Sequence, residues 1–317
     1  MSSQLSDAQP ALPVTETTFS SYDQNQGKAY AHARPDYDPG VYQAIINHHK
    51  STGGQFDTVV DVGCGPGSAT RGLAPFFANA IGLDPSQGMV ETARSFGGVS
   101  SASQPIRFEI STAEDLGAHL ATPISDSSVD LITAANAAHW FDMPQFWLAA
   151  ARILKPGGTV ALWTSGEIRV HPSMPNAAAL QAIFDEHTET YLKPFHVPGN
   201  YMVRSGYADL GLPWSIAQPV EAFDKESFVR KDWPAGEKFV VGESEVDLDT
   251  FEKIIGSGSP PTRWRQAHPE AVGTENDVVR ILRRKIERVL RESGVEEGKE
   301  RMRGTIHGVM LFVKKRA

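Results

Sequence analysis

The chain has 317 residues, of which 40% are hydrophobic, so it is long enough to bury a sizeable core. Its formal net charge of -8 argues against general binding to nucleic acid, which favours a basic surface. It contains a single cysteine, which excludes an intramolecular disulfide and a cysteine-based metal cluster, and no apolar run approaches the length that crosses a bilayer.

The first 18 residues are rich in Ser, Thr, Gln and Pro. They lack the basic start and the apolar centre of a secretory signal, so we expect a disordered tail on a cytoplasmic protein. Together with the missing apolar span, this composition predicts no association with a membrane.

A glycine-rich turn follows the first predicted strand. The β-branched run at residues 59–62 predicts a buried parallel strand, and it contains Asp61. Gly63, Gly65 and Gly67 follow at alternate positions, ahead of a predicted helix. Glycines allow the backbone to turn sharply and to approach a ligand closely. The spacing differs from the Gly-x-Gly-x-x-Gly pattern of dinucleotide sites, and this difference indicates another cofactor.

The acid before the glycines decides between two cofactors. Dinucleotide sites place a pyrophosphate on the helix N-terminus, and Asp61 would repel it. S-adenosylmethionine (SAM) has no phosphate and carries an ammonium and a sulfonium group, which a carboxylate attracts. The segment favours SAM and resembles motif I of the class I SAM-dependent methyltransferases; an NAD oxidoreductase is the disfavoured alternative. We expect Gly63, Cys64, Gly65 and Gly67 in the cofactor site, with Cys64 as a small packing residue.

The second predicted strand ends in Asp84, about 20 residues beyond the glycines, where doubly wound folds place an acid on the ribose hydroxyls. We therefore expect Asp84 to accept from both hydroxyls, with Pro85 and Ser86 beside it. Ser favours the N-cap position, so Ser86 predicts a helix from residue 87. Met89 on that helix packs either on the adenine or in the core.

Two more strands end near polar residues. Residues 105–110 alternate between apolar and polar, which predicts a third strand ahead of Ala113 and Glu114. In the superfamily that the chain resembles, this turn holds the adenine edge, so both residues are assigned to it; the alternative for Glu114 is a charge at a helix N-terminus. A fourth strand is predicted at residues 129–135 and is followed by Asn136.

These units precede a fifth predicted strand at residues 159–163 in one continuous run. The order predicts an α/β fold with a doubly wound, mostly parallel sheet, right-handed crossovers and helices on both faces. Ligands of such sheets bind beyond the carboxyl ends of the strands, where four predicted positions converge. These positions are Asp61, Asp84, Glu114 and Asn136.

Three segments give a more specific resemblance, and the first and the last of them are rarer than the glycine turn. They are Phe-Ser-Ser-Tyr-Asp at 19–23 with Tyr-Ala-His-Ala-Arg-Pro-Asp-Tyr at 30–37, the turn and its flanks at 60–70, and Thr-Ala-Ala-Asn-Ala-Ala-His-Trp-Phe-Asp at 133–142. Together they resemble the fungal trans-aconitate methyltransferases and their relatives, well over residues 19–163 and weakly beyond. That resemblance implies methyl transfer from SAM to a carboxylate of a small molecule, which yields a methyl ester and S-adenosylhomocysteine (SAH).

The resemblance also implies that the N-terminal segment folds over the active site. A carboxylate is already ionised at neutral pH and needs no general base, but it needs a cation to hold it. Arg34 is the candidate, because arginine grips a carboxylate with two hydrogen bonds; a structural salt bridge is the alternative. Tyr22 and Tyr30 are expected to line this lid or to pack within it.

His139 and Trp140 follow the fourth strand, where the acceptor approaches the methyl group. His139 can donate a hydrogen bond, act as a base toward a hydroxyl substrate or play a structural role. Trp140 is expected to form a wall of the pocket.

The second half departs from the resembled family. The trans-aconitate enzymes have an Arg-x-Trp-Ser element on a helix after the sixth strand, and this chain has Gly256 at the expected arginine. Arg263 and Arg265 flank Trp264 shortly afterwards, and Arg263 is our candidate replacement in substrate binding.

The remaining elements complete a seven-stranded, Rossmann-like sheet with a helical cap. We expect a cap helix near residues 177–191, a sixth strand within 222–233 and a helix at 277–292. Residues 304–314 are rich in apolar residues and are expected to form the seventh strand, at the edge. The resemblance implies that this strand is reversed and forms one antiparallel pair. The expected organisation is a tail (1–18) and one domain of lid helices (19–50), SAM-binding core (51–165), cap with the sixth strand (166–268) and C-terminal helix with the edge strand (269–317).

Other functions remain open at this level. One is O- or N-methylation of a secondary metabolite with His139 as the base. Another is a methyltransferase-like protein that binds SAM without transferring a methyl group. The sequence decides neither the acceptor nor whether the protein is a monomer or a homodimer, and it predicts no metal.

Overall fold

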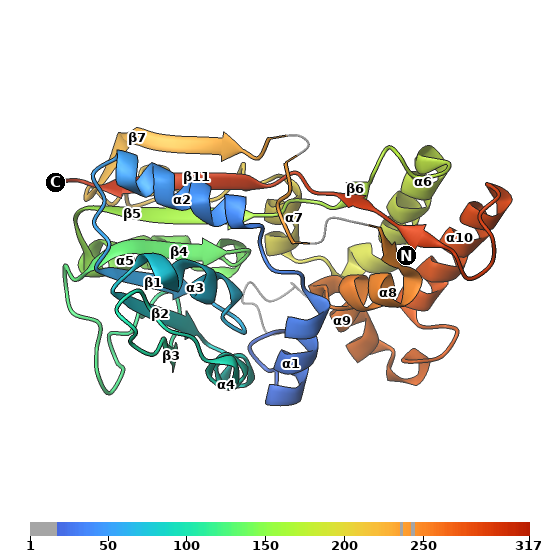
Figure 1. Cartoon of the computed structure of the whole chain (residues 1–317), viewed down its shortest axis with the longest axis horizontal. Helices are drawn as coiled ribbons and strands as arrows, with labels where there is room; N and C mark the ends of the chain where they lie inside the picture. Colours follow the sequence, from blue (N-terminus) through green and yellow to red (C-terminus); the bar gives the residue numbers. More distant parts are fainter. Residues whose placement is uncertain (1–17, 235–236, 242–244) are drawn as a thin grey trace, which may run out of the picture.

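The computed structural model describes residues 18–234, 237–241 and 245–317. Of the predicted tail, only Thr18 falls within the described residues, where it is buried. The centre of the fold is a seven-stranded sheet in the order β3-β2-β1-β4-β5-β11-β7 (Figure 1). The strands are β1 (Thr58–Val62), β2 (Asn79–Asp84), β3 (Arg107–Ile110), β4 (Val129–Ala135), β5 (Leu154–Thr164), β7 (Phe223–Asp232) and β11 (Val309–Lys315).

Strands β1 to β5 pair in parallel, whereas β11 runs antiparallel to both of its neighbours. The predicted doubly wound, mostly parallel seven-stranded sheet is therefore confirmed. The predicted position of the last strand was wrong, because β11 lies inside the sheet and β7 forms the edge. The physical reason is the composition of the two strands. Every residue of β11 but the last is buried, whereas β7 is mostly exposed and rich in charged residues, which edge strands favour.

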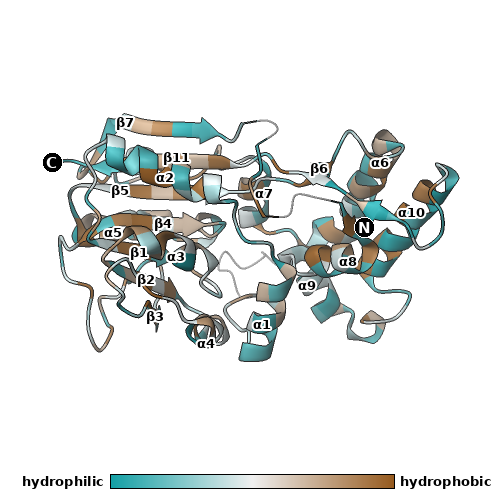
Figure 2. Cartoon of the chain, viewed as in Figure 1, coloured by the Kyte–Doolittle hydropathy of each residue, from teal (hydrophilic) through white to brown (hydrophobic). Residues whose placement is uncertain are grey.

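Alternating residues of the strands face two layers of helices. Val60, Ile132 and Val160 pack on the side of α5 (Met143–Ile153), with Phe146 and Trp147 fully buried there. The neighbouring strand residues face the other side, which is covered by α2 (Pro39–Ser51), α3 (Ser68–Leu73) and α4 (Gln87–Phe96). Figure 2 shows apolar residues concentrated in the central strands β4 and β5, and a hydrophilic end on β7.

A helical cap lies beyond the carboxyl ends of the parallel strands, with α1 (Gln24–Ala33) between the cap and the sheet (Figure 1). Three of its helices, α6, α8 and α10, share one apolar cluster, and the cap also contains two short antiparallel strand pairs. The predicted cap helix ends at His187 and continues as a π-helical turn, Thr188–Leu192. In the described residues no helix is long and apolar enough to span a membrane. The cap elements are α6 (Ala177–His187), α7 (Pro198–Arg204), α8 (Leu248–Gly256), α9 (Ser259–Ala267), α10 (Val278–Glu292), β6 (Arg169–Val170), β8 (Val246–Asp247), β9 (Arg301–Met302) and β10 (Gly304–Thr305).

Candidate functional site

The glycine turn between β1 and α3 leaves open space beside its backbone. Gly63 has a φ of +64°, and a Cβ there would lie 2.6 Å from Cβ of Ala137, so this position tolerates no side chain. Gly65 has a φ of +54°, and a Cβ there would meet no atom within 4 Å. The turn therefore presents bare backbone to a space that a ligand can fill, which fits the cofactor expected there.

Asp84 lies at the end of β2 and joins the glycine turn to the next helix. Its Oδ2 accepts from the backbone N–H of Gly65 at 2.8 Å, and its Oδ1 accepts from that of Ser86 at 2.9 Å. Ser86 in turn caps α4 by accepting from the N–H of Met89, as predicted. Asp84 is buried, with 8% of its surface exposed, and these contacts fix the position of its carboxylate.

Asp61 at the end of β1 is fully buried. Its two oxygens accept from the hydroxyls of Thr70 at 2.7 Å and Thr133 at 2.8 Å. Burial raises the pKa of Asp61 to about 6, while these hydrogen bonds oppose the shift. The carboxylate is thus largely ionised at neutral pH, and its negative field reaches the site although its oxygens are engaged by threonines.

The turn after β3, which contains Ala113 and Glu114, is held by contacts within the protein. Ala113 and Met89 are buried. Glu114 accepts from the backbone N–H of Asp142 at 2.9 Å, so one carboxylate oxygen ties this turn to the start of α5. Cys64 is buried, and burial raises the pKa of its thiol well above the ordinary value, which fits the predicted packing role.

Asn136 connects three segments at the carboxyl end of β4. Its φ of +50° places it in the left-handed region. Its Oδ1 accepts from the hydroxyl of Thr164 at 2.7 Å and from the N–H of Ser165 at 2.9 Å. Its Nδ2 donates to the hydroxyl of Tyr37 at 3.0 Å. The sequence indicated Asn136 but not Tyr37, which belongs to the loop between α1 and α2.

His139 lies in a short 3₁₀ helix, η2 (Ala138–Trp140), and is partly buried. Its Nδ1 lies 3.1 Å from the hydroxyl of Tyr207, which is 2% exposed. Burial lowers the pKa of His139 to about 3, so the ring is neutral at physiological pH. Trp140 packs tightly on α7, because a Cβ on Gly199 would lie 2.7 Å from its ring. Tyr207 follows no motif, and no signal in the sequence identified it.

Helix α1 is docked on α4 at two glycines. A Cβ on Gly27 would lie 2.8 Å from the carbonyl oxygen of Gly88, and a Cβ on Gly88 would lie 2.2 Å from that of Tyr22. The rings of Phe19, Tyr22 and Tyr30 meet edge to face, with centroids 5.4 to 6.5 Å apart. The two predicted lid residues, Tyr22 just before α1 and Tyr30 within it, therefore belong to one aromatic group.

Arg34 follows the last residue of α1 and points toward the cap. Its Nη2 donates to the carbonyl of Ser257 at 3.4 Å, and its Cζ lies 5.4 Å from the ring centroid of Tyr30. Its Nε is buried and has no hydrogen-bond partner, and no carboxylate forms an ion pair with it within the described residues.

The two cap arginines considered from the sequence are engaged internally. Arg263 donates to the carbonyl of Phe195, the hydroxyls of Thr18 and Ser259 and the side-chain oxygen of Asn200, at 2.6 to 3.3 Å. Arg263 thus joins cap segments to one another and to Thr18.

Arg265 occupies the space beside Gly256. It binds both oxygens of Asp277 at 2.9 Å, and a Cβ on Gly256 would lie 2.9 Å from its Nη1. A longer side chain at position 256 would therefore have to displace the guanidinium of Arg265.

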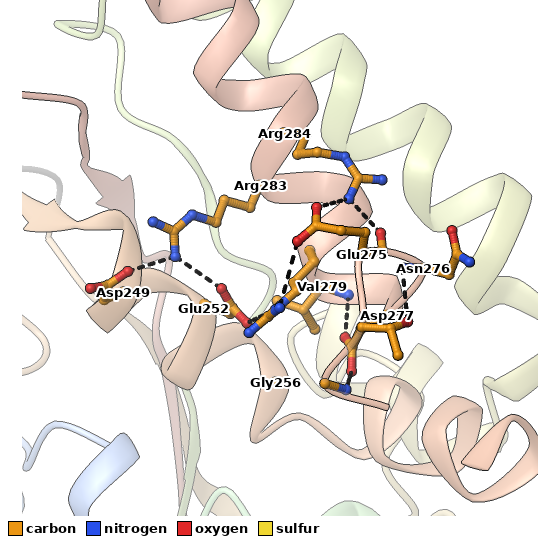
Figure 3. Close-up of polar contacts among 12 residues, drawn as sticks. Asp249, Glu252, Gly256, Glu275, Asn276, Asp277, Val279, Arg283 and Arg284 are labelled. Atoms are coloured by element: carbon orange, nitrogen blue, oxygen red, sulfur yellow. Dashed lines mark hydrogen bonds and ion pairs between the residues drawn. The ribbon is translucent and has the colours of Figure 1, made fainter. Parts of the chain in front are cut away.

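A cleft of about 720 Å³ lies between α1 and helices α8 to α10. Tyr22 and Tyr30 line one wall. The opposite wall is charged, but its arginines are paired with carboxylates. Arg283 lies 2.6 Å from Asp249 and 3.0 Å from Glu252, and Arg280 lies 3.3 Å from Glu252. Figure 3 shows Arg283 between the two carboxylates that it contacts.

Comparison with known proteins agrees with this geometry. Residues 60–162 match the family described as Methyltransferase domain. A methyltransferase of Dictyostelium discoideum is 30% identical over 197 residues, which cover 62% of this chain and 67% of that relative. The chain belongs to the class I SAM-dependent methyltransferases.

Other relatives of this methyltransferase match over a shorter region. CRG1 of Saccharomyces cerevisiae, a SAM-dependent methyltransferase by name, is 34% identical over 134 residues, which cover 42% of this chain and 43% of CRG1. AacuQ of Aspergillus aculeatus is 35% identical over 154 residues, 47% of each chain. The matched region thus spans about half the length of these two relatives. A solved type II methyltransferase from Anaeromyxobacter dehalogenans, 22% identical, covers 89% of this chain and 97% of its own with a TM-score of 0.56, which shows the shared fold.

Proposed function

We propose that this methyltransferase transfers the methyl group of SAM to a carboxylate of a small-molecule acid and forms a methyl ester and SAH. The observation that supports an anionic acceptor is Arg34, whose guanidinium has a buried Nε without a partner and no paired carboxylate in the described chain. A buried donor without an acceptor costs about 1–3 kcal/mol, so a bound carboxylate would recover that cost.

The neighbouring arginines support the same assignment by contrast. Arg265 is held by both oxygens of Asp277, and Arg263 has four acceptors within the protein. Arg34 therefore retains the donors that a carboxylate needs, and its planar group can present two parallel N–H bonds to it.

The cofactor arrangement that we propose follows the sheet order. Adenine lies at the turn of Ala113 and Glu114 after β3, and the ribose lies on Asp84 after β2. The methionyl end then lies at the carboxyl ends of β1 and β4, near the glycine turn and Asn136. The residues that fit the cofactor are Asp61, Gly63, Cys64, Gly65, Gly67, Asp84, Pro85, Ser86, Met89, Ala113, Glu114 and Asn136.

Methyl transfer to a carboxylate needs no general acid or base from the protein. When bound, the cofactor supplies an electrophilic methyl group on a sulfonium. The acceptor carboxylate is ionised at neutral pH, so the protein needs to orient its oxygen in line with the methyl carbon and sulfur. Such orientation can contribute about 7–11 kcal/mol to lowering a barrier. Arg34 would orient the acid, Tyr22, Tyr30 and Trp140 would exclude water, and the field of Asp61 would favour the cation.

His139 is poorly suited to the alternative chemistry. A hydroxyl acceptor needs a base with a pKa near the working pH. Burial lowers the pKa of His139 to about 3, so its ring accepts a proton weakly. A role as a neutral hydrogen-bonding group fits better than that of a general base.

The direct test offers labelled SAM and a panel of acids led by trans-aconitate, with products identified by mass spectrometry. A labelled methyl ester would support the proposal. Methylation of hydroxyl or amine compounds in a parallel secondary-metabolite panel, with every acid left unmodified, would contradict it.

Three matched variants test the role of Arg34. Arg34→Gln should raise KM for the acid about tenfold or more, with the Kd of SAH nearly unchanged. Arg263→Gln and Arg265→Gln remove guanidinium groups that are paired within the protein, so we expect lower thermal stability with a smaller change in KM. A larger KM effect for either of these two would move the acid-binding role to the cap.

A further inference from the structure

Tyr37 lies in the loop that connects α1 to α2, and its ring is fixed from three sides. The rings of Tyr42, Trp163 and Phe239 contact it edge to face, with centroid distances of 6.2, 5.5 and 5.8 Å. Edge-to-face contacts of this kind restrict the ring to one orientation. The hydroxyl of Tyr37 is therefore held in one place, against Asn136 at the carboxyl end of β4.

The partners of Asn136 determine what the Tyr37 hydroxyl can do. The backbone N–H of Ser165 can only donate, so the Asn136 atom facing it at 2.9 Å is Oδ1. The amide NH₂ must then face Tyr37 and donate to the phenolic oxygen. Because that oxygen accepts from Asn136, the O–H of Tyr37 is free to donate elsewhere. Within the described residues it has no acceptor.

The indole N–H of Trp163, whose ring contacts that of Tyr37, is a second donor without an acceptor among the described residues. Nε1 of Trp163 is fully buried and has no hydrogen-bond partner in the described chain. A protein interior rarely leaves such donors without acceptors. The two rings are in contact at the carboxyl ends of β4 and β5, with centroids 5.5 Å apart, and Tyr37 is the less buried of the two. The Tyr37 hydroxyl is therefore the donor that an oxygen ligand would use here.

The order of the strands in the sheet indicates which ligand oxygen would accept this hydrogen bond. Strands β3, β2, β1 and β4 are consecutive neighbours, and the proposed cofactor runs across their ends from adenine to methionine. Its amino-acid end, farthest from the adenine, then reaches β4, where Asn136 and Tyr37 meet. That end has one ammonium and one carboxylate. The negative field of Asp61 suits the ammonium, which leaves the carboxylate for a neutral or positive donor.

We infer that the hydroxyl of Tyr37, oriented by Asn136, donates a hydrogen bond to the methionyl carboxylate of SAM. This inference rests on the cofactor arrangement proposed above and is independent of the acceptor. Burial raises the pKa of Tyr37, so the phenol keeps its proton throughout the physiological range and remains a donor.

The test compares two ligands that differ at the amino-acid end. SAH contains the carboxylate, whereas methylthioadenosine lacks the amino acid. Isothermal titration of the full chain with Tyr37→Phe should give a Kd for SAH about tenfold higher than wild type, as expected for a hydrogen bond to a charged group. The Kd for methylthioadenosine should not change.

A matched control removes a neighbouring hydroxyl from the same aromatic group. Tyr42 donates to the carboxylate of Asp36 at 2.8 Å, so its hydroxyl already has an acceptor within the protein. Tyr42→Phe should reduce thermal stability and leave both Kd values unchanged. An equal loss for both ligands in Tyr37→Phe, or the same SAH loss in Tyr42→Phe, would mean a structural role and overturn the inference.

The alternative ligand for the Tyr37 hydroxyl is the carboxylate of an acid acceptor. An unchanged Kd for SAH in Tyr37→Phe, with or without a raised KM for an acid acceptor, would also overturn the inference. This result does not depend on the proposed function, because SAH binding is measured without any acceptor. Conversely, if no acid is methylated, the proposed function fails, but SAH binding still tests the role of Tyr37.

Discussion

The carboxylate of Asp84 accepts from the backbone N–H of Gly65 at 2.8 Å, and this contact joins the ends of the first two strands. The other oxygen accepts from the N–H of Ser86, at the start of α4. Asp84 thus fixes the glycine turn and the helix that follows it while it remains 8% exposed. Our proposal also places the ribose hydroxyls on this carboxylate, because it lies at the carboxyl end of β2 beside the glycine turn.

Replacing Asp84 should therefore affect both cofactor binding and stability. We expect Asp84→Ala to weaken SAM binding by about tenfold or more, or about 1.4 kcal/mol, with a lower melting temperature. Asp84→Asn keeps one acceptor oxygen and should lose less stability. Calorimetric titration with SAM checks the affinity, and Asp126→Ala, an exposed acid far from these strand ends, is the control. Unchanged SAM binding in Asp84→Ala would contradict the ribose assignment.

Much of this site could be predicted because it depends on strand order. Parallel strands of alternating units bring their carboxyl ends to one edge, so Asp61, Asp84 and Asn136 converge whatever the details of packing. Capping is equally local: Ser86 was predicted from one residue and its neighbour, and the structure confirms it. The family of the protein followed from the same local features.

The missed features depend on contacts between distant segments. Tyr37 meets Asn136 across 99 positions of the chain, and Tyr207 meets His139 across 68, so no periodicity or spacing reveals them. The predicted order of the last two strands was wrong for another reason, since the apolar segment 304–314 was assigned to the edge although the charge pattern of β7 already indicated an edge strand. Arg263 was chosen for its place in the sequence, whereas its partners are determined by the tertiary fold.

The docking of α1 on α4 gives a second prediction. A Cβ on Gly88 would lie 2.2 to 2.4 Å from the backbone of Tyr22 and Asp23, and backbone cannot move aside as a flexible side chain can. We expect Gly88→Ala to displace α1, raise the Kd of SAH about tenfold and increase proteolysis in α1. Gly53→Ala is a control: its φ of +80° imposes strain, about 1 kcal/mol, in open space away from α1. Normal SAH binding and protease resistance in Gly88→Ala would show that α1 can dock in another way.

The raised pKa of Asp61 leads to a prediction of how SAM binding depends on pH. Burial raises its pKa to about 6 from the ordinary value of 3.8. Between these values the folded protein binds more protons than the unfolded chain, so the contribution of Asp61 to stability falls as pH rises toward 6. A cationic ligand favours the ionised form, so SAM affinity should rise about tenfold from pH 5 to 7.

The variant Asp61→Asn separates this group from others that titrate. Its SAM affinity should be about tenfold weaker at pH 7 and nearly independent of pH, because the neutral amide supplies no counter-charge. Calorimetric titrations at several pH values, with melting temperatures at each, would measure both effects. The same pH dependence in the variant and in the wild type would assign the titration to another group.

A variant of His139 distinguishes methyl transfer to a carboxylate from methyl transfer to a hydroxyl. A general base usually contributes 10²–10⁴-fold to the rate, whereas a neutral ring that fills space beside Tyr207 contributes much less. Because burial lowers the pKa of His139 to about 3, we expect His139→Gln to reduce kcat by less than about tenfold and to leave the shape of the pH–rate profile unchanged between pH 6 and 8. Tyr207→Phe, which removes the hydroxyl 3.1 Å from Nδ1, should cost about 1 kcal/mol of stability with a similarly small change in kcat. A loss of about a hundredfold or more in His139→Gln, together with the disappearance of an acidic limb in the profile, would instead identify a base and redirect the search to hydroxyl acceptors.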